Sequence, residues 1–304
     1  MDYLFILAGL ALLIAGGEAV VRGASSLASK LGLSPVLIGL TVVGFGTSMP
    51  ELMVSLDAAL GGSPDIALGN VVGSNIANIL LILGVTALIW PIQTATLSLG
   101  RALWLVMVAT LALIVPFAMG SIGLGFGVAF LGVLTLYLVL AFRETTELEG
   151  ADAGIAPLNI WISTGLILGG LVGLMVGANA LVSGATALAR LWGLSEAYIG
   201  LTIVAVGTSL PELATSLVAA LRRQPGIAVG NVVGSNIFNI LGILGVTAVV
   251  TPIPVTSRFL TFDLPVMLAA TVAMLLALRL PRIGRSVGLV FLLGYAVYLW
   301  AAQG

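Results

Sequence analysis

The sequence predicts an all-α polytopic membrane protein in which ten transmembrane helices form two inverted five-helix repeats. Of its 304 residues, 60% are hydrophobic and only 8% are charged, and the mean hydropathy is +1.23. This composition excludes an ordinary soluble domain. The apolar stretches have the length of about 17–25 residues that crosses ~30 Å of hydrocarbon. A shift of 161 residues aligns 39–92 with 200–253 without a gap, and 37 of these 54 positions are identical.

The duplication divides the chain into a first repeat (1–142), a polar linker (143–157) and a second repeat (158–304). The first apolar segment has no basic residue before it, so we expect a retained helix rather than a cleaved signal peptide. The expected helices of the first repeat are 3–24, 36–60, 65–89, 99–117 and 120–142. Those of the second repeat are 158–186, 197–221, 226–250, 259–278 and 284–302.

The basic residues predict the orientation of the two repeats. An odd number of helices per repeat makes the copies cross the membrane in opposite senses, as in many secondary transporters. With both termini outside the cell, the outer loops hold only Arg190 and Arg258. The inner side then holds nine basic residues, which satisfies the positive-inside rule: Arg22, Lys30, Arg101, Arg143, Arg222, Arg223, Arg279, Arg282 and Arg285. We therefore expect a multi-pass protein of the plasma or inner membrane, with a cytoplasmic linker.

The composition also limits the chemistry. The chain has no cysteine and no histidine, which removes disulfides and the usual zinc, copper, haem and iron–sulfur sites. A bound metal must therefore be held by oxygen atoms. No phosphate-binding loop, polybasic run or nucleophile–base pair is present, so we expect no ATP, no nucleic acid and no enzyme activity. We expect no cofactor, and a monomer in the lipid bilayer.

The most informative motif is GTSMPE (46–51), which recurs as GTSLPE (207–212). Each copy places a glutamate, Glu51 or Glu212, inside an apolar segment, where an ionised side chain costs ~3 kcal/mol on insertion scales. The proline of each copy interrupts the helix, which frees carbonyl oxygens, and the preceding hydroxyls add neutral ligands. A simple proline kink is the alternative, but two copies with unpaired glutamates favour a cation site. Its hydroxyl residues are Thr47, Ser48, Thr208 and Ser209.

A second motif, GNVVGSNIANI (69–79), recurs as GNVVGSNIFNI (230–240). Residues four apart share one helical face, so the motif carries a polar stripe. The glycines also form a small-residue pattern that lets helices pack closely. The motif can therefore both pack against another helix and supply ligands. We expect ligand roles for Ser74, Asn78, Ser235 and Asn239, whereas a ligand role and a packing role remain equally open for Asn70 and Asn231.

Two further features of the sequence carry local predictions. Glu18 precedes Arg22 by four residues, so we expect an ion pair between them. Tryptophans near helix ends, among them Trp90, are expected to anchor the chain at the membrane interface.

The paired GTSMPE/GTSLPE and GNVVGSN motifs resemble the two alpha-repeats of the cation/calcium antiporters, in particular the prokaryotic sodium/calcium exchangers. The resemblance covers essentially the whole chain and implies exchange of cytosolic Ca²⁺ for external Na⁺ by alternating access. It implies Ca²⁺ ligands in the two glutamates and in carbonyls of Thr47 and Thr208. It further implies Na⁺ sites that use Ser48, Ser74, Thr208, Ser209 and Ser235, with carbonyls near Gly44 and Ala205, and a middle site completed by Asn78 and Asn239.

Some relatives carry an aspartate at the position of Asn239, notably in the potassium-dependent branch, so the asparagine here argues against K⁺ co-transport. Two alternatives remain open from the residues themselves. A proton/calcium exchanger, or an exchanger of another divalent cation, could use the same glutamates. A cation channel would conduct without a counter-ion.

Overall fold

The structure, a computed structural model, describes residues 2–144, 158–193 and 205–302, which are mostly helical. In this part of the chain, seven helices are long and apolar enough to cross a membrane. The number is eight if the bent pair 35–47 and 49–60 forms one span. Two further apolar helices, 210–221 and 285–301, are shorter. This is the architecture of a multi-pass integral membrane protein.

The first half runs in chain order through the following elements. They are α1 (Asp2–Leu31), α2 (Pro35–Ile38), the π-helical turn η1 (Gly39–Val43), α3 (Gly44–Thr47), α4 (Met49–Leu60), α5 (Pro64–Ala77), the π-helical turn η2 (Asn78–Leu83), α6 (Gly84–Ile89), β1 (Ile92–Gln93), α7 (Gly100–Ala112), α8 (Ile114–Ala118), β2 (Ser121–Ile122) and α9 (Leu124–Glu144). The expected helices 36–60 and 65–89 each consist of several consecutive pieces, because π-helical turns interrupt the regular ladder.

The second half shows the same succession. It comprises α10 (Ile160–Leu191), α12 (Ala205–Gly207), α13 (Leu210–Leu221), α14 (Pro225–Ile237), η5 (Phe238–Ile243), α15 (Leu244–Val250), β3 (Ile253–Pro254), η6 (Phe259–Asp263), α16 (Leu264–Ala277), β4 (Arg282–Ile283) and α17 (Arg285–Ala301). The start of the expected helix 197–221 lies outside the described residues.

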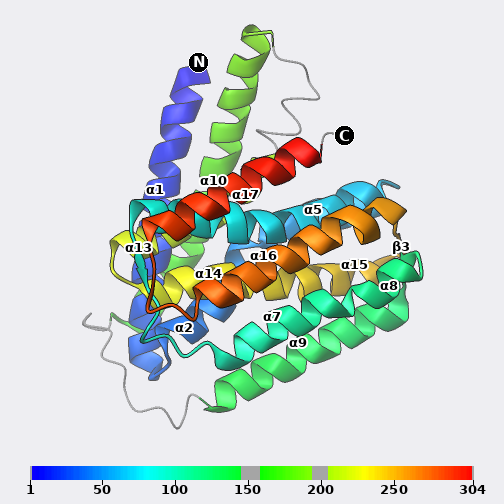
Figure 1. Ribbon diagram of the computed structural model, residues 1–304. Helices are drawn as coiled ribbons and strands as arrows, with labels where there is room; N and C mark the ends of the chain where they lie inside the picture. Colours follow the sequence, from blue (N-terminus) through cyan, green and yellow to red (C-terminus); the bar gives the residue numbers. More distant parts are fainter. Residues whose placement is uncertain (1, 145–157, 194–204, 303–304) are drawn as a thin grey trace.

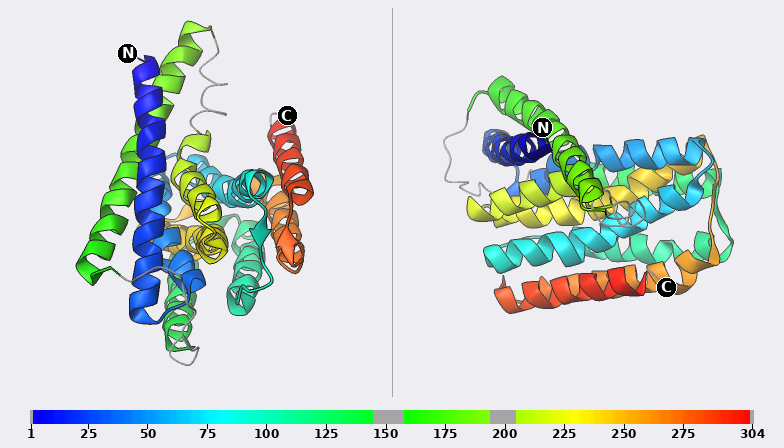
Figure 2. Two further views of the ribbon diagram at one scale, coloured as in Figure 1. Left: turned by 90° about the vertical axis from the view of Figure 1, so that its left-hand side faces the viewer. Right: turned by 90° about the horizontal axis from the view of Figure 1, so that it is seen from above.

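Helices α1 and α10 pack along each other as an antiparallel pair at one side of the molecule, inclined steeply to the other helices (Figures 1 and 2). Glycines bring the two backbones together. A Cβ atom on Gly16 would lie 2.8 Å from the carbonyl oxygen of Gly170, and one on Gly9 would lie 2.7 Å from that of Gly177. Both helices are longer than the predicted 3–24 and 158–186. Hydropathy underestimates the lengths of both helices, because small and polar residues continue each helix beyond its apolar stretch.

The continuous segments α5–η2–α6 and α14–η5–α15 form the centre of the molecule. Of their most apolar windows, 72% and 89% of the residues are buried, against 17–39% for the other spans found in the described chain. Figure 2 shows these segments running among the remaining helices. A helix buried on all sides can keep polar residues away from lipid. The two copies of the GNVVGSN motif are therefore positioned to face other protein segments.

Two short ribbons connect the halves of the chain at helix ends. Strand β1 pairs antiparallel with β4, with Ile92 opposite Ile283, and β2 pairs with β3, with Ile122 opposite Ile253. These positions are related by the same shift of 161 residues as the sequence motifs. Each half thus makes the same pairing with the other half.

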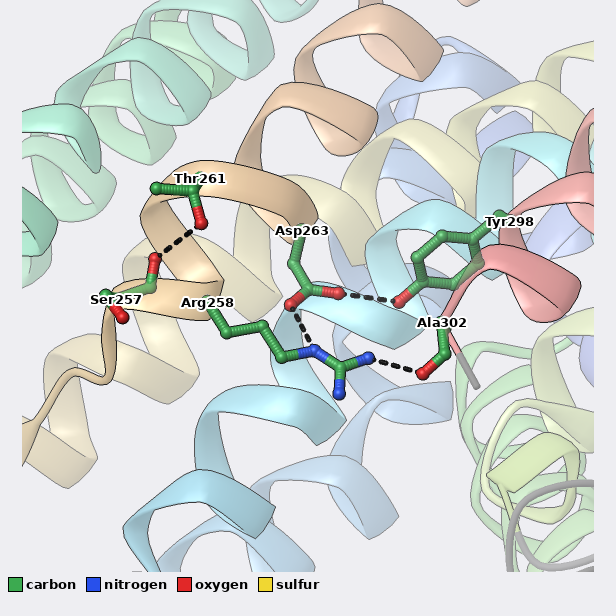
Figure 3. Close-up of polar contacts among 6 residues, drawn as sticks. All are labelled: Ser257, Arg258, Thr261, Asp263, Tyr298 and Ala302. Carbon is green, nitrogen blue, oxygen red and sulfur yellow. Dashed lines mark hydrogen bonds and ion pairs between the residues drawn. The ribbon is translucent and has the colours of Figure 1, made fainter. Parts of the chain in front are cut away.

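A polar cluster fastens the last helix to η6 (Figure 3). Asp263 is 5% exposed and accepts a hydrogen bond of 3.2 Å from the Tyr298 hydroxyl. Arg258 lies 3.6 Å from the same carboxylate and donates a bond of 2.7 Å to the carbonyl oxygen of Ala302. The cluster therefore joins the start of the α16 segment to the end of α17.

The expected ion pair within the first helix is wrong. Glu18 pairs with Arg222 at the end of α13, with nitrogen–oxygen distances of 2.7 and 2.8 Å. Helix α1 packs against α13, so a partner that is distant in sequence lies closer than Arg22.

Candidate functional site: a buried pair of carboxylates

Both glutamates lie in the first turn of a helix that begins at a break. Ser48 separates α3 from α4 with φ −85° and ψ 7°, and the two parts of the span are bent by 43°. Ser209 has nearly the same backbone angles, −88° and 5°, before α13. The prolines occupy the first turns of α4 and α13, where their missing N–H groups cost little. The predicted interruption is therefore present in both copies, and it directs Glu51 and Glu212 inward.

The two carboxylates are linked crosswise by serines of the opposite motif. The Ser48 hydroxyl donates a hydrogen bond of 3.0 Å to Oε1 of Glu212. The Ser209 hydroxyl lies 3.5 Å from Oε1 of Glu51. Each glutamate is 1% exposed, and the two are close enough to repel each other when both are ionised. The structure thus brings together the residues on which the predicted site depends.

Neither carboxylate is neutralised by a basic side chain of the residues that the structure describes. No arginine or lysine in the described chain forms a salt bridge with Glu51 or Glu212, and Oε2 of each glutamate has no hydrogen-bond partner there. Buried ionised groups are strongly unfavourable unless they are paired or coordinate a metal. The pair therefore has the properties expected of a site that a cation completes.

Asn78 and Asn239 contribute further free oxygens. The Asn78 amide nitrogen donates 3.0 Å to Oδ1 of Asn236, and the Asn239 amide nitrogen donates 3.0 Å to the hydroxyl of Ser74. Both Oδ1 atoms are buried and have no hydrogen-bond partner among the described residues. The π-helical turns η2 and η5 begin at or just before these asparagines, and such turns occur frequently at functional sites. In each amide the nitrogen is therefore engaged, and the oxygen is left for a ligand.

Asn70 and Asn231, whose role the sequence left open, hold the backbone of the glutamates. The Asn70 amide donates 3.0 Å to the carbonyl of Glu51 and 2.8 Å to the hydroxyl of Ser55. The Asn231 amide makes the matched bonds, 3.2 Å to the Glu212 carbonyl and 2.9 Å to a serine hydroxyl. Their amide nitrogens therefore position the peptide units of the glutamates.

The remaining predicted residues surround this centre. The Thr47 hydroxyl donates 3.1 Å to Oδ1 of Asn231, and the Ser235 hydroxyl donates 3.1 Å to the carbonyl of Gly44. Thr208 lies in the turn between α12 and α13, and Ala205 is the first residue of α12. The carbonyl of Gly44 is thus engaged by a hydroxyl from the opposite half of the chain.

Matched residues of the two halves differ in burial. Thr47 is 1% exposed, whereas its counterpart Thr208 is half-buried. Asn231 is fully buried, whereas its counterpart Asn70 is half-buried. Both more exposed residues lie on the same side of the carboxylates in the predicted topology. The centre is therefore packed more tightly on one side than on the other.

Two asparagines of the site were not predicted from the sequence. Asn75 and Asn236 lie one residue beyond the serine of each GNVVGSN motif, off the stripe defined by a spacing of four. Asn236 accepts the Asn78 amide, and its own amide lies 3.5 Å from the carbonyl of Asn75. The available signal was that both copies of the motif carry an asparagine at this position. Only the packing of α5 against α14 shows that they meet.

The donor set suits hard cations. The described chain holds no cluster of three or more acidic residues placed to bind one metal ion, so two carboxylates, amide oxygens and hydroxyls make up the set. Oxygen ligands of this kind bind Ca²⁺ and related ions. Neutral oxygens also allow a monovalent ion to occupy the same space.

This buried, oxygen-lined centre in a membrane protein is typical of the class of cation antiporters, and the comparisons with known proteins support that assignment. The family of the sodium/calcium exchanger protein matches residues 1–143 and 162–303, and the chain belongs to this family. CaxA of Alkalimonas amylolytica is 42% identical over 307 residues, covering 97% of this chain and 96% of its own. The sodium/calcium exchanger MaX1 of Methanosarcina acetivorans is 36% identical over 341 residues, covering 98% and 97%.

Solved structures agree with the sequence comparison. The sodium-calcium exchanger NCX_Mj soaked without Na⁺ and Ca²⁺ has a TM-score of 0.86 with 32% identity, covering 99% of this chain and 98% of that one. The same protein soaked with 2.5 mM Na⁺ and 0.1 mM Ca²⁺ has a TM-score of 0.84 and 33% identity, covering 97% and 96%. At this identity and coverage, the chain has the fold of the exchanger family.

Proposed function

We propose that this protein exchanges Ca²⁺ for Na⁺ across the membrane by alternating access, in the direction of Ca²⁺ extrusion and independently of K⁺. The observation that carries the proposal is the crosswise pair of buried glutamates, which no basic side chain in the described chain neutralises. Family membership and the structural likeness to NCX_Mj support it. The uncharged Asn239 supports the K⁺ independence.

The proposed ligands come from both halves of the chain. Calcium is held by the two carboxylates, whose Oε2 atoms are free, and by threonine carbonyls. Sodium ions use hydroxyls, asparagine Oδ1 atoms and backbone carbonyls next to the same carboxylates. The full set is Glu51, Glu212, Thr47, Thr208, Ser48, Ser209, Ser74, Ser235, Asn78, Asn239, Gly44 and Ala205.

The coupling between Ca²⁺ and Na⁺ transport follows from the charge of the two glutamates. The two glutamates carry −2, which one Ca²⁺ neutralises and which Na⁺ ions neutralise when several bind. Because both kinds of ion need Glu51 and Glu212, they compete and do not bind together. An empty site would carry two buried, uncompensated charges, and that cost hinders the conversion between inward-facing and outward-facing states. Exchange is then favoured over leak.

The orientation remains part of the proposal. We place both termini outside and the linker in the cytoplasm, with ten spans arranged as two inverted repeats in the cell membrane and the protein acting as a monomer. The matched β1–β4 and β2–β3 ribbons support the repeat symmetry. In this orientation the half-buried Asn70 and Thr208 lie on the outer side of the carboxylates. This difference in burial supports a state that is more accessible from the outside.

Transport in proteoliposomes tests the proposal. Vesicles loaded with Na⁺ and diluted into Na⁺-free buffer should take up radioactive calcium, and replacing K⁺ with choline should change nothing. Glu51→Gln, which keeps the size of the side chain, should abolish uptake. Asp57→Asn removes an exposed acid from the same helix and should leave uptake intact.

The alternatives give different results in the same vesicles. Uptake that follows a pH gradient and ignores Na⁺ would contradict Na⁺ coupling and support proton exchange. Uptake that needs no counter-ion gradient would support a channel. Full activity of Glu51→Gln would refute the ligand assignment itself.

A further inference from the structure

A pocket of about 260 Å³ lies away from the carboxylates, where the turn between α13 and α14 meets the end of α6. Its walls are mostly apolar and come from distant parts of the sequence. Strand β1, which forms one wall, is fixed by its pairing with β4. The residues that matter for its chemistry are Trp90, Pro91, Arg223 and Pro225.

The backbone of Arg223 is held in an unusual conformation. Its φ is 57°, and it is the one residue other than glycine with a positive φ in the described chain. The matched position of the first half is Gly62, with φ 76°, a residue that adopts this conformation without strain. Strained backbone of this kind is found preferentially at functional sites. An arginine at a position suited to glycine therefore indicates a use for its side chain.

The guanidinium of Arg223 is available for a ligand. The neighbouring Arg222 is paired with Glu18, at 2.7 Å. Arg223 is exposed and forms no salt bridge in the described chain. Arg282 lies in β4, opposite the pocket residue Gln93. The pocket therefore combines mostly apolar walls with the positive charge of Arg223, which no acidic side chain of the described chain pairs.

We propose that this pocket binds the headgroup region of an anionic glycerophospholipid. The lipid phosphate accepts hydrogen bonds from Arg223, whose planar guanidinium suits bidentate phosphate contacts. The indole of Trp90, which is 39% exposed, lies at headgroup depth as interfacial tryptophans do. The glycerol and the first methylene groups pack against Pro91 and Pro225, which line the pocket and are half-buried. Basic pockets between helices at the membrane surface are a recognised mode of binding anionic lipids.

Thermal unfolding of the purified full chain in uncharged detergent tests the proposal. Addition of phosphatidylglycerol should raise the melting temperature by several degrees, and phosphatidylcholine should not. The variant Arg223→Gly restores the residue of the matched position, so it should fold and lose the response to phosphatidylglycerol. Arg22→Gln is the matched control, because it removes an exposed basic charge outside the pocket and should keep the full response.

Two results would overturn the proposal. If wild type and Arg223→Gly responded equally to phosphatidylglycerol, the lipid would act elsewhere on the molecule. If glycerol 3-phosphate or inorganic phosphate reproduced the stabilisation at equal concentration, the site would recognise soluble phosphate and not a lipid. Native mass spectrometry that counts retained phosphatidylglycerol should show one fewer bound lipid in Arg223→Gly than in Arg22→Gln.

Discussion

At the scale of single residues, the site depends on which atom of each polar group remains free. A hydroxyl or an amide can bind a cation only through oxygen, so its hydrogen atoms must be directed elsewhere. Asn236 does this for Asn78, and Ser74 does it for Asn239. Asn70 and Asn231 hold the glutamate carbonyls. Much of the selectivity of the centre is therefore expected to reside in hydrogen bonds beside the ion.

Removal of the Asn236 acceptor should weaken Ca²⁺ binding without stopping transport. In Asn236→Ala the Asn78 amide loses its partner and can rotate away from the ion, which costs roughly 1.4 kcal/mol, or tenfold in affinity. We expect the KM for Ca²⁺ uptake to rise about tenfold with kcat little changed. Thr110→Val is the control, because the buried Thr110 hydroxyl bonds to the carbonyl of Val106 in its own helix α7. An equal effect of both variants would argue for general packing damage.

At the scale of elements, close contact between α1 and α10 makes them one packing unit. The contact relies on glycines that face the opposite backbone, and neighbouring glycines on the same helix face away. A Cβ atom on Gly170 would lie 2.7 Å from the Gly16 carbonyl oxygen, whereas one on Gly169 meets nothing within 4 Å.

The substitutions Gly170→Ala and Gly169→Ala should therefore have opposite effects on stability. The first forces the two backbones apart and should destabilise the protein by about 1–3 kcal/mol. The second should be neutral or stabilise by up to about 1 kcal/mol, since alanine favours helix over glycine. Thermal unfolding in detergent measures both. Similar melting temperatures for the two variants would contradict the close contact.

The attachment of α17 through Asp263 gives a second prediction at this scale. Arg258→Gln leaves a buried carboxylate with only the Tyr298 hydroxyl, which should cost about 1–3 kcal/mol of stability. The double variant Arg258→Gln/Asp263→Asn removes the unpaired charge and should recover part of the loss. A double variant less stable than the sum of the single changes would contradict a direct pairing of the two side chains.

At the scale of the whole molecule, matched residues of the two halves differ in burial around the carboxylates. Two inverted repeats can exchange their conformations. Such an exchange would bury the more exposed residues of one side and expose their counterparts on the opposite side. In the proposed orientation, half-buried Asn70 and Thr208 lie on the outer side of the carboxylates, and buried Thr47 and Asn231 lie on the inner side. The second repeat supplies most of the closed side through α14, which is buried along nearly its full length.

Cysteine labelling can measure this access, because the chain contains no cysteine of its own. In right-side-out vesicles, a membrane-impermeant maleimide should label Thr208→Cys at least tenfold faster than Thr47→Cys, an order-of-magnitude expectation from the difference in burial. In inside-out vesicles, Thr47→Cys should be labelled faster than Thr208→Cys only when the protein is driven into its other state. Equal rates for both variants from the outside would contradict the unequal access.

The sequence by itself determined the membrane class, most helix positions, the duplication and the two lone glutamates. These properties follow from local composition and from a repeated pattern, which act at short range along the chain. Tertiary structure alone decided that Ser48 reaches Glu212, that Asn236 orients Asn78 and that Glu18 pairs with Arg222. Each of these contacts joins residues more than 150 positions apart. Such contacts depend on how the two halves pack, and a repeat that specifies both halves alike does not specify their mutual arrangement.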